Sequence, residues 1–512
     1  MPSPDANVAS WLLRHAAERG DQPALADATR RLDYATLEER VQRCAGALAE
    51  RGVRRGDRAA LVLGNATPFL ETVLACARLG AIAVPLNARL TARELRGLLA
   101  DCTPRLLLTD AGHRAAARRA CEQLSEPPAR WLDLDATGDD YESALADAVP
   151  HEAVAAVSPD DPMLLLYTSG TTGRPKGALL PHRKTLANAR NAELFFGLVP
   201  EDRVLVVLPL FHSFGLKILA LPTLHSGGSV VLQAHFDAAE IWRTAARERI
   251  TFFGGVPTMF RALLEALESP EAQDLELGSL RFLFGAGAAV PVELIRDFER
   301  HGLVLKQGFG QTETSILCCL DARDAVRKAG SVGRPVAHAE VRCVRTEGIE
   351  AAPSHWQDVT PGETGEIVVR GPLTMIGYWQ RPEATAEVLR EGWLRTGDLA
   401  TVDAEGFYTL VGRARHMFIS GGENVYPAEV EATFLEHPAV REIAVVGVAD
   451  ERWGEVGHAW WVPEQGKAVD EATLRAWACE RLADFKRPQR FFRVSELPRT
   501  ETGKVKKHEL RG

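Results

Sequence analysis

Short continuous runs of apolar residues alternate with amphipathic stretches through the first 320 residues of the chain. The amphipathic stretches at 34–51 and 68–79 repeat their apolar positions with helical spacing. The apolar runs predict strands buried on both faces, because a half-exposed strand would alternate apolar with polar residues. These runs lie at 59–63, 106–108, 163–167, 204–208, 229–232 and 282–284. The alternation of helical and strand patterns predicts parallel sheets covered by helices.

The pattern changes after about residue 330. Segments 365–371 and 406–412 predict strands of a more antiparallel, barrel-like region, and residues 403–406 supply a turn between two strands. A last unit begins near residue 416, with a helix at 427–436 and a strand at 443–447. A chain of 512 residues is expected to hold two to four domains.

Composition and charge exclude several classes of partner. Hydrophobic residues make up 46% and charged residues 25% of the chain, as in a globular protein with a large core. The net charge of −9 argues against nucleic acid as the main partner, because duplex binding needs a basic face. The eight cysteines form no CxxC pair or metal-binding cluster, and the N-terminus has no signal-peptide pattern, so we expect reduced thiols and a cytoplasmic location. No apolar run reaches about 18 residues, so no transmembrane segment is predicted.

The segment 167–177, Tyr-Thr-Ser-Gly-Thr-Thr-Gly-Arg-Pro-Lys-Gly, carries the strongest chemical signal. It follows a predicted buried strand directly, where α/β sheets bind ligands. Its glycines allow a tight turn, and its hydroxyl and backbone N–H groups suit phosphate oxygens. Most tracts of this kind are surface turns, but the length, the basic residues and the preceding strand favour a phosphate-binding loop. The GxxxxGK[ST] spacing of a P-loop is absent.

This segment resembles the phosphate loop of the adenylate-forming superfamily, which comprises acyl-CoA synthetases, peptide-synthetase adenylation domains and beetle luciferases. Further family motifs follow in the family's order up to residue 507, and the resemblance covers essentially the whole chain. It implies an α/β fold with a large N-terminal domain at 1–415, made of two helix-covered sheets and a distorted β-barrel, and a small mobile α+β C-terminal domain at 416–512. It also implies an enzyme that uses ATP, Mg2+ and coenzyme A. An acid first displaces pyrophosphate to form acyl-AMP, and the thiol of coenzyme A then displaces AMP.

The resemblance assigns the nucleotide site residue by residue. In Gly-Phe-Gly-Gln-Thr-Glu at 308–313, it implies that Thr312 contacts the α-phosphate and that Glu313 holds Mg2+, which binds through one or two carboxylates and substrate phosphates. Asp398 would accept hydrogen bonds from the ribose, with Arg413 as a second ribose contact. Alone, each motif would be read as an ordinary cap or turn. The predicted nucleotide-binding residues are Thr168, Ser169, Gly170, Thr171, Thr172, Gly173, Lys176, Gly285, Ala286, Gly287, Gln307, Gly308, Phe309, Gly310, Thr312, Asp398 and Arg413.

The C-terminal domain is expected to alternate between the two reactions. By resemblance, Lys504 is the adenylation lysine, whose ammonium offsets charge that accumulates between the carboxylate and the α-phosphate. Gly421 and Gly422 belong to a loop that would let the pantetheine arm of coenzyme A pass. His416 stands where the family has an aspartate or lysine pivot, and we expect it to make the second reaction sensitive to pH. Without the other motifs, Lys504 would be read as part of a solvated basic tail.

The segment 209–215, Pro-Leu-Phe-His-Ser-Phe-Gly, resembles the part of the family that lines the acyl pocket. His212 is expected near the reacting carboxylate, and together with Lys504, Thr168 and Glu313 it completes the predicted catalytic set. Lys217 could pair with a polar group of the substrate or reach out to solvent. The predicted pocket residues are Phe211, His212, Phe214, Lys217, Ile218, Val256, Met259 and Ala288.

Most of these pocket residues are apolar, so we expect a fatty, alicyclic or aryl acid as substrate. Adenylation of an amino acid for a carrier protein is disfavoured, because the segment 209–217 has no acidic residue to pair with a substrate ammonium. The same motifs are also compatible with a luciferase-like oxygenase or with a nucleotide-binding regulator without turnover. The sequence leaves open peripheral membrane contact and the choice between a monomer and a homodimer.

Overall fold

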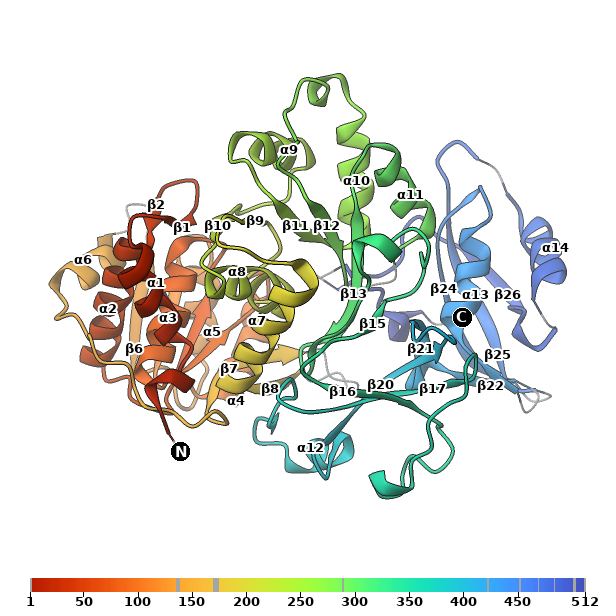
Figure 1. Cartoon of the computed structure of the whole chain (residues 1–512). Helices are drawn as coiled ribbons and strands as arrows, with labels where there is room; N and C mark the ends of the chain where they lie inside the picture. The colour runs from red at the N-terminus through yellow and green to blue at the C-terminus, as the bar shows by residue number, and fades with distance from the viewer. Residues whose placement is uncertain are drawn as a thin grey trace. The chain divides into compact units, whose positions relative to one another are not determined.

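The computed structural model describes residues 2–134, 139–168, 175–287, 290–420, 423–450, 453–467, 469–482, 484–500 and 503–510. The chain divides into two compact units, one formed by residues 1–340 and 369–394 and the other by residues 341–368 and 395–512. Figure 1 labels many of the helices and strands of each unit. The predicted boundary between an N-terminal domain at 1–415 and a mobile C-terminal domain at 416–512 marks the point about which the domains would move. This boundary stays a prediction.

The first sheet of the larger unit has the strand order β18-β8-β7-β4-β3-β5-β6. Its strands are β3 (Arg58–Val62), β4 (Ile82–Pro85), β5 (Leu106–Asp110), β6 (Arg130–Leu134), β7 (Pro162–Thr168), β8 (Lys176–Pro181) and β18 (Gly377–Tyr378). The strands from β7 to β6 pair in parallel, whereas β8 and β18 pair antiparallel. The predicted parallel sheet is therefore present and is extended on one side by antiparallel strands.

The second sheet has the order β15-β14-β13-β12-β11-β9-β10-β1-β2. Its strands are β1 (Pro23–Ala26), β2 (Arg31–Asp33), β9 (Arg203–Val206), β10 (Ser229–Leu232), β11 (Phe252–Gly255), β12 (Phe282–Gly285), β13 (Leu305–Gln311), β14 (Ser315–Cys319) and β15 (Arg334–Pro335). The central strands pair in parallel, and β1, from the start of the chain, pairs in parallel with β10.

Helices cover both sheets, as the patterns predicted. They are α1 (Ala9–Arg19), α2 (Tyr34–Glu50), α3 (Thr67–Leu79), α4 (Ala92–Cys102), α5 (Arg114–Cys121), α6 (Asp139–Asp147), α7 (His182–Phe196), α8 (Leu221–His225), α9 (Ala238–Arg247), α10 (Pro257–Leu267), α11 (Val292–Arg300) and α12 (Pro382–Val388). A π-helix, η2 (Phe214–Ala220), leads directly into α8. Local caps fix several helix starts: Asp33 accepts from the Thr36 amide at α2, and Thr91 and Glu94 form a capping box at α4.

Each sheet has its own apolar core. Leu95 and Leu99 of α4 and Ala117 of α5 pack against Val62 and Leu107 of the first sheet. Against the second sheet pack apolar residues of α9, α10 and α11, among them Trp242, Phe260, Leu263, Ile295 and Phe298. Because apolar strands are covered in this way, polar groups of the larger unit can gather at the strand ends, where the candidate site lies.

The smaller unit contains most of the remaining strands. One sheet has the order β16-β17-β20-β19, with β21 paired to β20, and the other has the order β23-β22-β25-β24, with β26 paired to β25. These strands are β16 (Glu340–Val344), β17 (Thr364–Arg370), β19 (Leu389–Arg390), β20 (Trp393–Val402), β21 (Tyr408–Arg413), β22 (Phe418–Ser420), β23 (Glu423–Val425), β24 (Val440–Asp450), β25 (Gly454–Pro463) and β26 (Arg490–Arg493). Helices α13 (Pro427–Leu435) and α14 (Glu471–Arg481) pack on the second of these sheets around Val430, Phe434 and Leu474.

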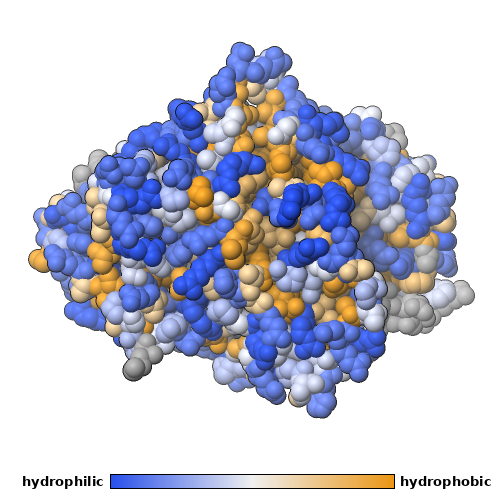
Figure 2. Space-filling model, viewed as in Figure 1, coloured by the Kyte–Doolittle hydropathy of each residue, from blue (hydrophilic) through white to orange (hydrophobic). Residues whose placement is uncertain are grey.

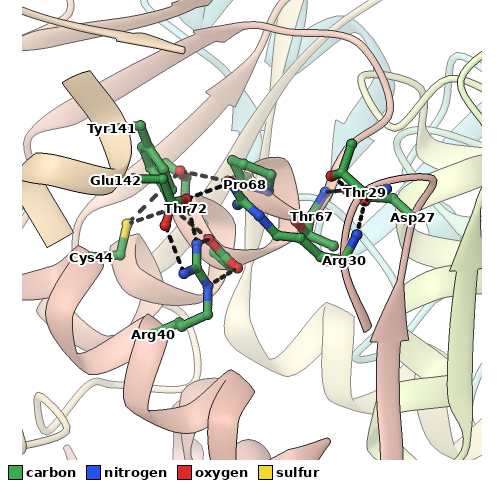
Figure 3. Close-up of polar contacts among 11 residues, drawn as sticks. Asp27, Thr29, Arg30, Arg40, Cys44, Thr67, Pro68, Thr72, Tyr141 and Glu142 are labelled. Atoms are coloured by element: carbon green, nitrogen blue, oxygen red, sulfur yellow. Dashed lines mark hydrogen bonds and ion pairs between the residues drawn. The ribbon is translucent and has the colours of Figure 1, made fainter. Parts of the chain in front are cut away.

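A buried ion-pair network joins α2, α3 and α6 beside the first sheet (Figure 3). The guanidinium of Arg40 donates to Glu71 and to Glu142, with closest nitrogen–oxygen distances of 2.7 Å to each carboxylate. The Tyr141 hydroxyl donates to Glu71 at 2.8 Å, and Arg30 pairs with Glu142 at 2.7 Å. Because the side chain of Glu71 is fully buried, these donors are what make its charge tolerable there.

Replacing Arg40 with methionine is expected to destabilise the protein by about 3 kcal/mol, because the buried carboxylate of Glu71 loses its charged partner. Urea denaturation measures the change in the free energy of unfolding. Arg43→Met is the matched control: Arg43 forms a more exposed pair with Glu39 on the same helix, which is worth less than about 1 kcal/mol. Equal losses in the two variants would contradict this account of the network.

Candidate active site

Three side chains from distant parts of the larger unit meet at the end of β7. The hydroxyl of Thr168, the last residue of β7, lies 3.5 Å from Oε1 of Glu313, which follows β13. The hydroxyl of Tyr378 donates to the same carboxylate oxygen at 2.9 Å. Thr168 and Glu313 are thus brought together as the motifs predicted, and Tyr378 is a residue that the sequence analysis missed.

Lys176 lies beside this group at the start of β8. Its ammonium nitrogen is 5.3 Å from the centre of the Tyr378 ring, a distance typical of a cation–π contact. Backbone pairing of Thr168 with Lys176 closes the ends of the predicted phosphate loop. The loop residues Ser169, Gly170, Thr171, Thr172 and Gly173 lie outside the described residues. The described ends of the loop therefore bring the Thr168 hydroxyl to the Glu313 carboxylate and the Lys176 ammonium to the ring of Tyr378, which contacts the same carboxylate.

A tight hairpin between β13 and β14 positions Glu313. Gln311 pairs with Ser315 across the hairpin, and the Gln311 amide donates to the Thr314 hydroxyl at 3.0 Å. Ser315 has a φ of 60°, in the left-handed region that residues other than glycine rarely adopt. The Met375 amide donates to the Glu313 carbonyl at 2.8 Å and fixes the hairpin from the other side.

Gly310 is required by the close approach of the two hairpin strands. A Cβ atom at this position would lie 1.9 Å from the carbonyl oxygen of Ser315. Gly310→Ala is therefore expected to displace the Thr312–Glu313 turn and to cost about 2 kcal/mol of stability. Thermal denaturation and an acyl-AMP assay measure the two effects. Gly278→Ala is the control, because a Cβ there meets no atom within 4 Å, and an unchanged Gly310→Ala enzyme would contradict the prediction.

The predicted wall of the base pocket lies on two adjacent strands. Gly285 of β12 is paired with Gln307 of β13, and Gly308 and Phe309 follow on the same strand. Phe309 is buried, and the Nε2 atom of buried Gln307 has no hydrogen-bond partner among the described residues. Ala286 is partly buried and Gly287 is exposed just beyond β12. Ala288 lies outside the described residues.

An amide clamp holds the segment that leads to His212. The Asn65 side chain accepts a hydrogen bond from the Leu210 amide at 2.9 Å and donates to the Leu208 carbonyl at 3.0 Å. The Phe214 amide donates to Nδ1 of His212 at 3.2 Å, so the hydrogen of the neutral ring lies on Nε2. Asn65 is a second residue that sequence analysis missed, because it lies 145 residues before the segment that it holds.

The predicted pocket residues of the larger unit surround the start of η2. Phe214 packs edge-on against Phe284 of β12, with ring centres 5.8 Å apart, and a Cβ on Gly254 would meet the Phe214 ring. Ile218 is buried, whereas Phe211, Val256 and Met259 are partly exposed. Figure 2 shows hydrophobic side chains gathered over β11, β12 and α10 on an otherwise largely hydrophilic face. This apolar wall fits the predicted apolar acid.

Of the two alternatives left open for Lys217, the structure excludes a side chain that reaches out to solvent. Its side chain is fully buried in η2, and burial lowers its pKa to about 7. Sequence reasoning could not settle this point, because a lysine in an apolar stretch can either snorkel or be enclosed.

The smaller unit holds the remaining predicted residues. Asp398 and Arg413 are paired across β20 and β21, and the Arg413 Nε lies 2.7 Å from Oδ1 of Asp398. Lys504 is exposed at a turn, where its amide donates to the Thr500 hydroxyl at 3.1 Å. His416 ends a short 3-10 turn after β21. Gly421 and Gly422 lie outside the described residues.

Comparison with known proteins identifies the family. The sequence model of the AMP-binding enzymes matches residues 12–379, and that of the AMP-binding enzyme C-terminal domain matches residues 429–504. The chain belongs to the AMP-binding enzymes. It is 42% identical to a feruloyl-CoA synthase of Amycolatopsis and 41% identical to an indoleacetate–CoA ligase of Aromatoleum aromaticum, covering 98% of this chain in both alignments and 98% and 97% of the relatives.

Among solved structures, the chain resembles o-succinylbenzoate CoA synthetase of Bacillus subtilis in complex with its acyl-adenylate intermediate. The TM-score is 0.86 and the identity 33%, and the alignment covers 100% of this chain and 98% of the other. These findings confirm the predicted superfamily and fold class. They also confirm the predicted class of enzyme, an AMP-forming acid–CoA ligase that acts through acyl-AMP.

As an AMP-binding enzyme of this class, the protein uses ATP and coenzyme A. In the described part of the chain, no group of three or more His, Cys, Asp or Glu side chains could hold a metal ion. The single carboxylate of Glu313, partly exposed beside hydroxyl groups, does fit Mg2+ brought in with substrate phosphates. No helix among the described residues is long and apolar enough to cross a membrane.

Proposed function

We propose that this enzyme activates an aryl acid with ATP and Mg2+ and transfers the aryl-acyl group to coenzyme A. The proposal is supported by the two relatives with 42% and 41% identity, whose names specify feruloyl and indoleacetate groups. The edge-on pair of Phe214 and Phe284 supports it as well, because flat apolar groups pack well against aromatic rings. A fatty acid is the second candidate, favoured by a fatty-acid–CoA ligase of Mycobacterium tuberculosis with 33% identity.

The observation that carries the adenylation step is the meeting of Thr168, Tyr378 and Glu313 beside the phosphate loop. In the proposed first reaction, a carboxylate oxygen of the acid attacks the α-phosphorus of ATP and pyrophosphate leaves. Glu313 would hold Mg2+, which would offset charge on the phosphates, and the Thr168 hydroxyl and the Lys176 ammonium would face the phosphate oxygens. Lys504 stabilises the charge that develops at the α-phosphorus.

In the proposed second reaction, the thiolate of coenzyme A attacks the acyl carbon and AMP leaves with the electron pair of the broken bond. Gly421 and Gly422 border the route of the pantetheine arm. Residues 1–415 and 416–512 move relative to each other between the reactions, with His416 as the pivot, because such hinges are a few residues at the ends of elements. Asp398 and Arg413 hold the ribose throughout.

An acid panel tests the proposed substrate class. Pyrophosphate release and AMP release are measured with acetate, medium and long fatty acids, benzoates, cinnamates and malonate, with and without coenzyme A. We expect kcat/KM for the best cinnamate or benzoate to exceed that for every fatty acid by at least about 10-fold, which is roughly 1.4 kcal/mol. A fatty acid that matches the best aryl acid would refute the substrate class, and a panel without pyrophosphate release would refute the activity itself.

A further inference from the structure

Two fully buried lysines lie on adjacent elements behind the acyl segment. Lys184 is in the first turn of α7 and Lys217 is in η2, and both side chains have 0% exposure. The Lys184 ammonium donates to the Ser315 hydroxyl at 2.5 Å. The Lys217 ammonium has no hydrogen-bond partner within the part of the chain that the structure describes. Burying an unpaired ammonium costs folding free energy, so the presence of this lysine points to a bound ligand as its hydrogen-bond partner.

The surroundings of Lys217 form a polar site whose charges are mostly positive. Asn188 of α7 donates from Nδ2 to the Lys217 carbonyl at 2.6 Å, while its Oδ1 has no partner among the described residues. Burial is the main cause that lowers the pKa of Lys184 and of Lys217. Nearby positive charges lower both pKa values further: Lys217 and Arg183 act on Lys184, and Arg183 acts on Lys217. The carboxylate of Glu313 acts on the pKa of Lys184 in the opposite direction, so Lys184 lies within electrostatic reach of the candidate catalytic carboxylate.

A purely structural role explains these residues poorly. The Lys217 ammonium makes no hydrogen bond to the described residues, so a methionine of similar length would lose none there. A methionine would also avoid the cost of removing an amine from water. The same π-helix also presents Phe214 to the apolar wall, so Lys217 and the wall belong to one rigid element. A π-helical turn is itself frequent at functional sites.

We infer that the acid substrate carries an anionic oxygen remote from its reacting carboxylate, and that Lys217, supported by Asn188, receives this oxygen. The inference rests on the proposed function and narrows it from aryl acids in general to aryl acids with a second carboxylate or an ionisable phenol. Lys184 adds a second amine from α7, and its hydrogen bond to the Ser315 hydroxyl holds it in place. Binding then replaces the water lost by a buried ammonium with a charge-assisted hydrogen bond.

Four cinnamates of similar size test this inference: the unsubstituted acid and its 4-methyl, 4-hydroxy and 4-carboxy derivatives. In the wild-type enzyme, we expect kcat/KM for the 4-carboxy or the 4-hydroxy acid to exceed that for the 4-methyl acid by at least 10-fold. The derivative with the higher kcat/KM shows whether the anionic oxygen belongs to a carboxylate or to a phenol. Lys217→Met should reduce this ratio by at least 10-fold, while kcat/KM for the 4-methyl acid and KM for ATP stay within 3-fold.

Lys306→Met is the matched control, because Lys306 is a buried lysine of β13 whose ammonium already contacts the Phe195 carbonyl. It should keep the wild-type ratio, and Lys217→Gln, which retains a donor, should keep part of it. A wild-type preference for the 4-methyl acid, or an unchanged ratio in Lys217→Met, would overturn the inference. Activity with unsubstituted cinnamate distinguishes failure of this inference from failure of the proposed function. If either of these results is found while the enzyme still activates unsubstituted cinnamate, the inference about Lys217 fails and the proposed aryl-acid–CoA ligase function stands.

Discussion

Replacing Lys504 with alanine is expected to slow acyl-AMP formation by about 10²–10³-fold, the loss typical of removing one donor from a developing negative charge. Groups other than the Lys504 side chain hold its turn, since the Thr500 amide donates to the Lys504 carbonyl at 2.7 Å and the Arg499 guanidinium donates to the Gly503 carbonyl at 2.6 Å. Truncation of the exposed side chain should therefore leave the turn in place. Acid-dependent pyrophosphate release measures the effect.

The control for this experiment lies two residues away. Lys506 pairs with Glu509 at 3.0 Å, and Lys506→Ala should leave pyrophosphate release within about 3-fold of wild type, because a surface pair of this kind contributes little. Thioester formation from preformed acyl-AMP should also persist in Lys504→Ala, since Lys504 is proposed to act only in the first reaction. A Lys504→Ala enzyme with the wild-type rate of pyrophosphate release would exclude Lys504 as the adenylation lysine.

Lys217→Met is expected to stabilise the ligand-free protein at pH 7 by roughly 3–5 kcal/mol, because burial lowers the pKa of Lys217 from 10.5 to about 7 and each pKa unit corresponds to about 1.4 kcal/mol. Between pH 7 and 10.5 the unfolded chain binds a proton at this lysine that the folded chain does not bind. The free energy of unfolding of the wild type therefore rises with pH through this window. The difference in the free energy of unfolding in favour of the methionine variant should be largest at pH 7 and below, and should shrink toward pH 10.5.

Urea denaturation of both proteins at pH 7, 8.5 and 9.5 measures this difference. Lys184 and His182 of α7 also feel the charge of Lys217, and burial lowers the pKa of His182 to about 4, but both groups are present in each protein. The difference between the two curves thus reports mainly on Lys217. A methionine variant that is less stable than wild type, or whose advantage does not change with pH, would contradict the prediction. Agreement would mean that the enzyme retains Lys217 at a cost in stability, as functional sites often require.

The local parts of the fold could be predicted from sequence because their signals are local. Helices expected at 34–51 and 68–79 are observed at Tyr34–Glu50 and Thr67–Leu79, and the apolar run 59–63 corresponds to β3. The family motifs also led to Thr168 and Glu313, which the fold brings together across 145 residues of sequence. Patterns of burial are therefore enough to predict the architecture, and resemblance to known motifs is enough to find Thr168 and Glu313, whose roles at the nucleotide stay predictions.

The remaining features depend on contacts between distant segments. Tyr378 lies in a two-residue strand that has no strong pattern of its own and reaches Glu313 only because β18 pairs with β8. Asn65 acts through three backbone groups that follow the ends of β9 and β10, and no property of its neighbours in sequence indicates that role. The enclosure of Lys217 likewise follows from the packing of α7 on η2, which periodicity along either segment does not reveal.

Strand β1 acquires its main neighbour late in the synthesis of the chain. Leu25 and Ala26 pair with Val230 and Val231 of β10, which are about 200 residues further along. At 5–20 residues per second, roughly 10–40 s separate the emergence of the two strands from the ribosome. Until then the described strand paired with β1 is β2, and only helices made early, such as α2, can cover this hairpin, which is marginally stable in water by itself. The first strands of this enzyme therefore stay without their main partner strand, and accessible to chaperones and proteases, until nearly half of the polypeptide has been made.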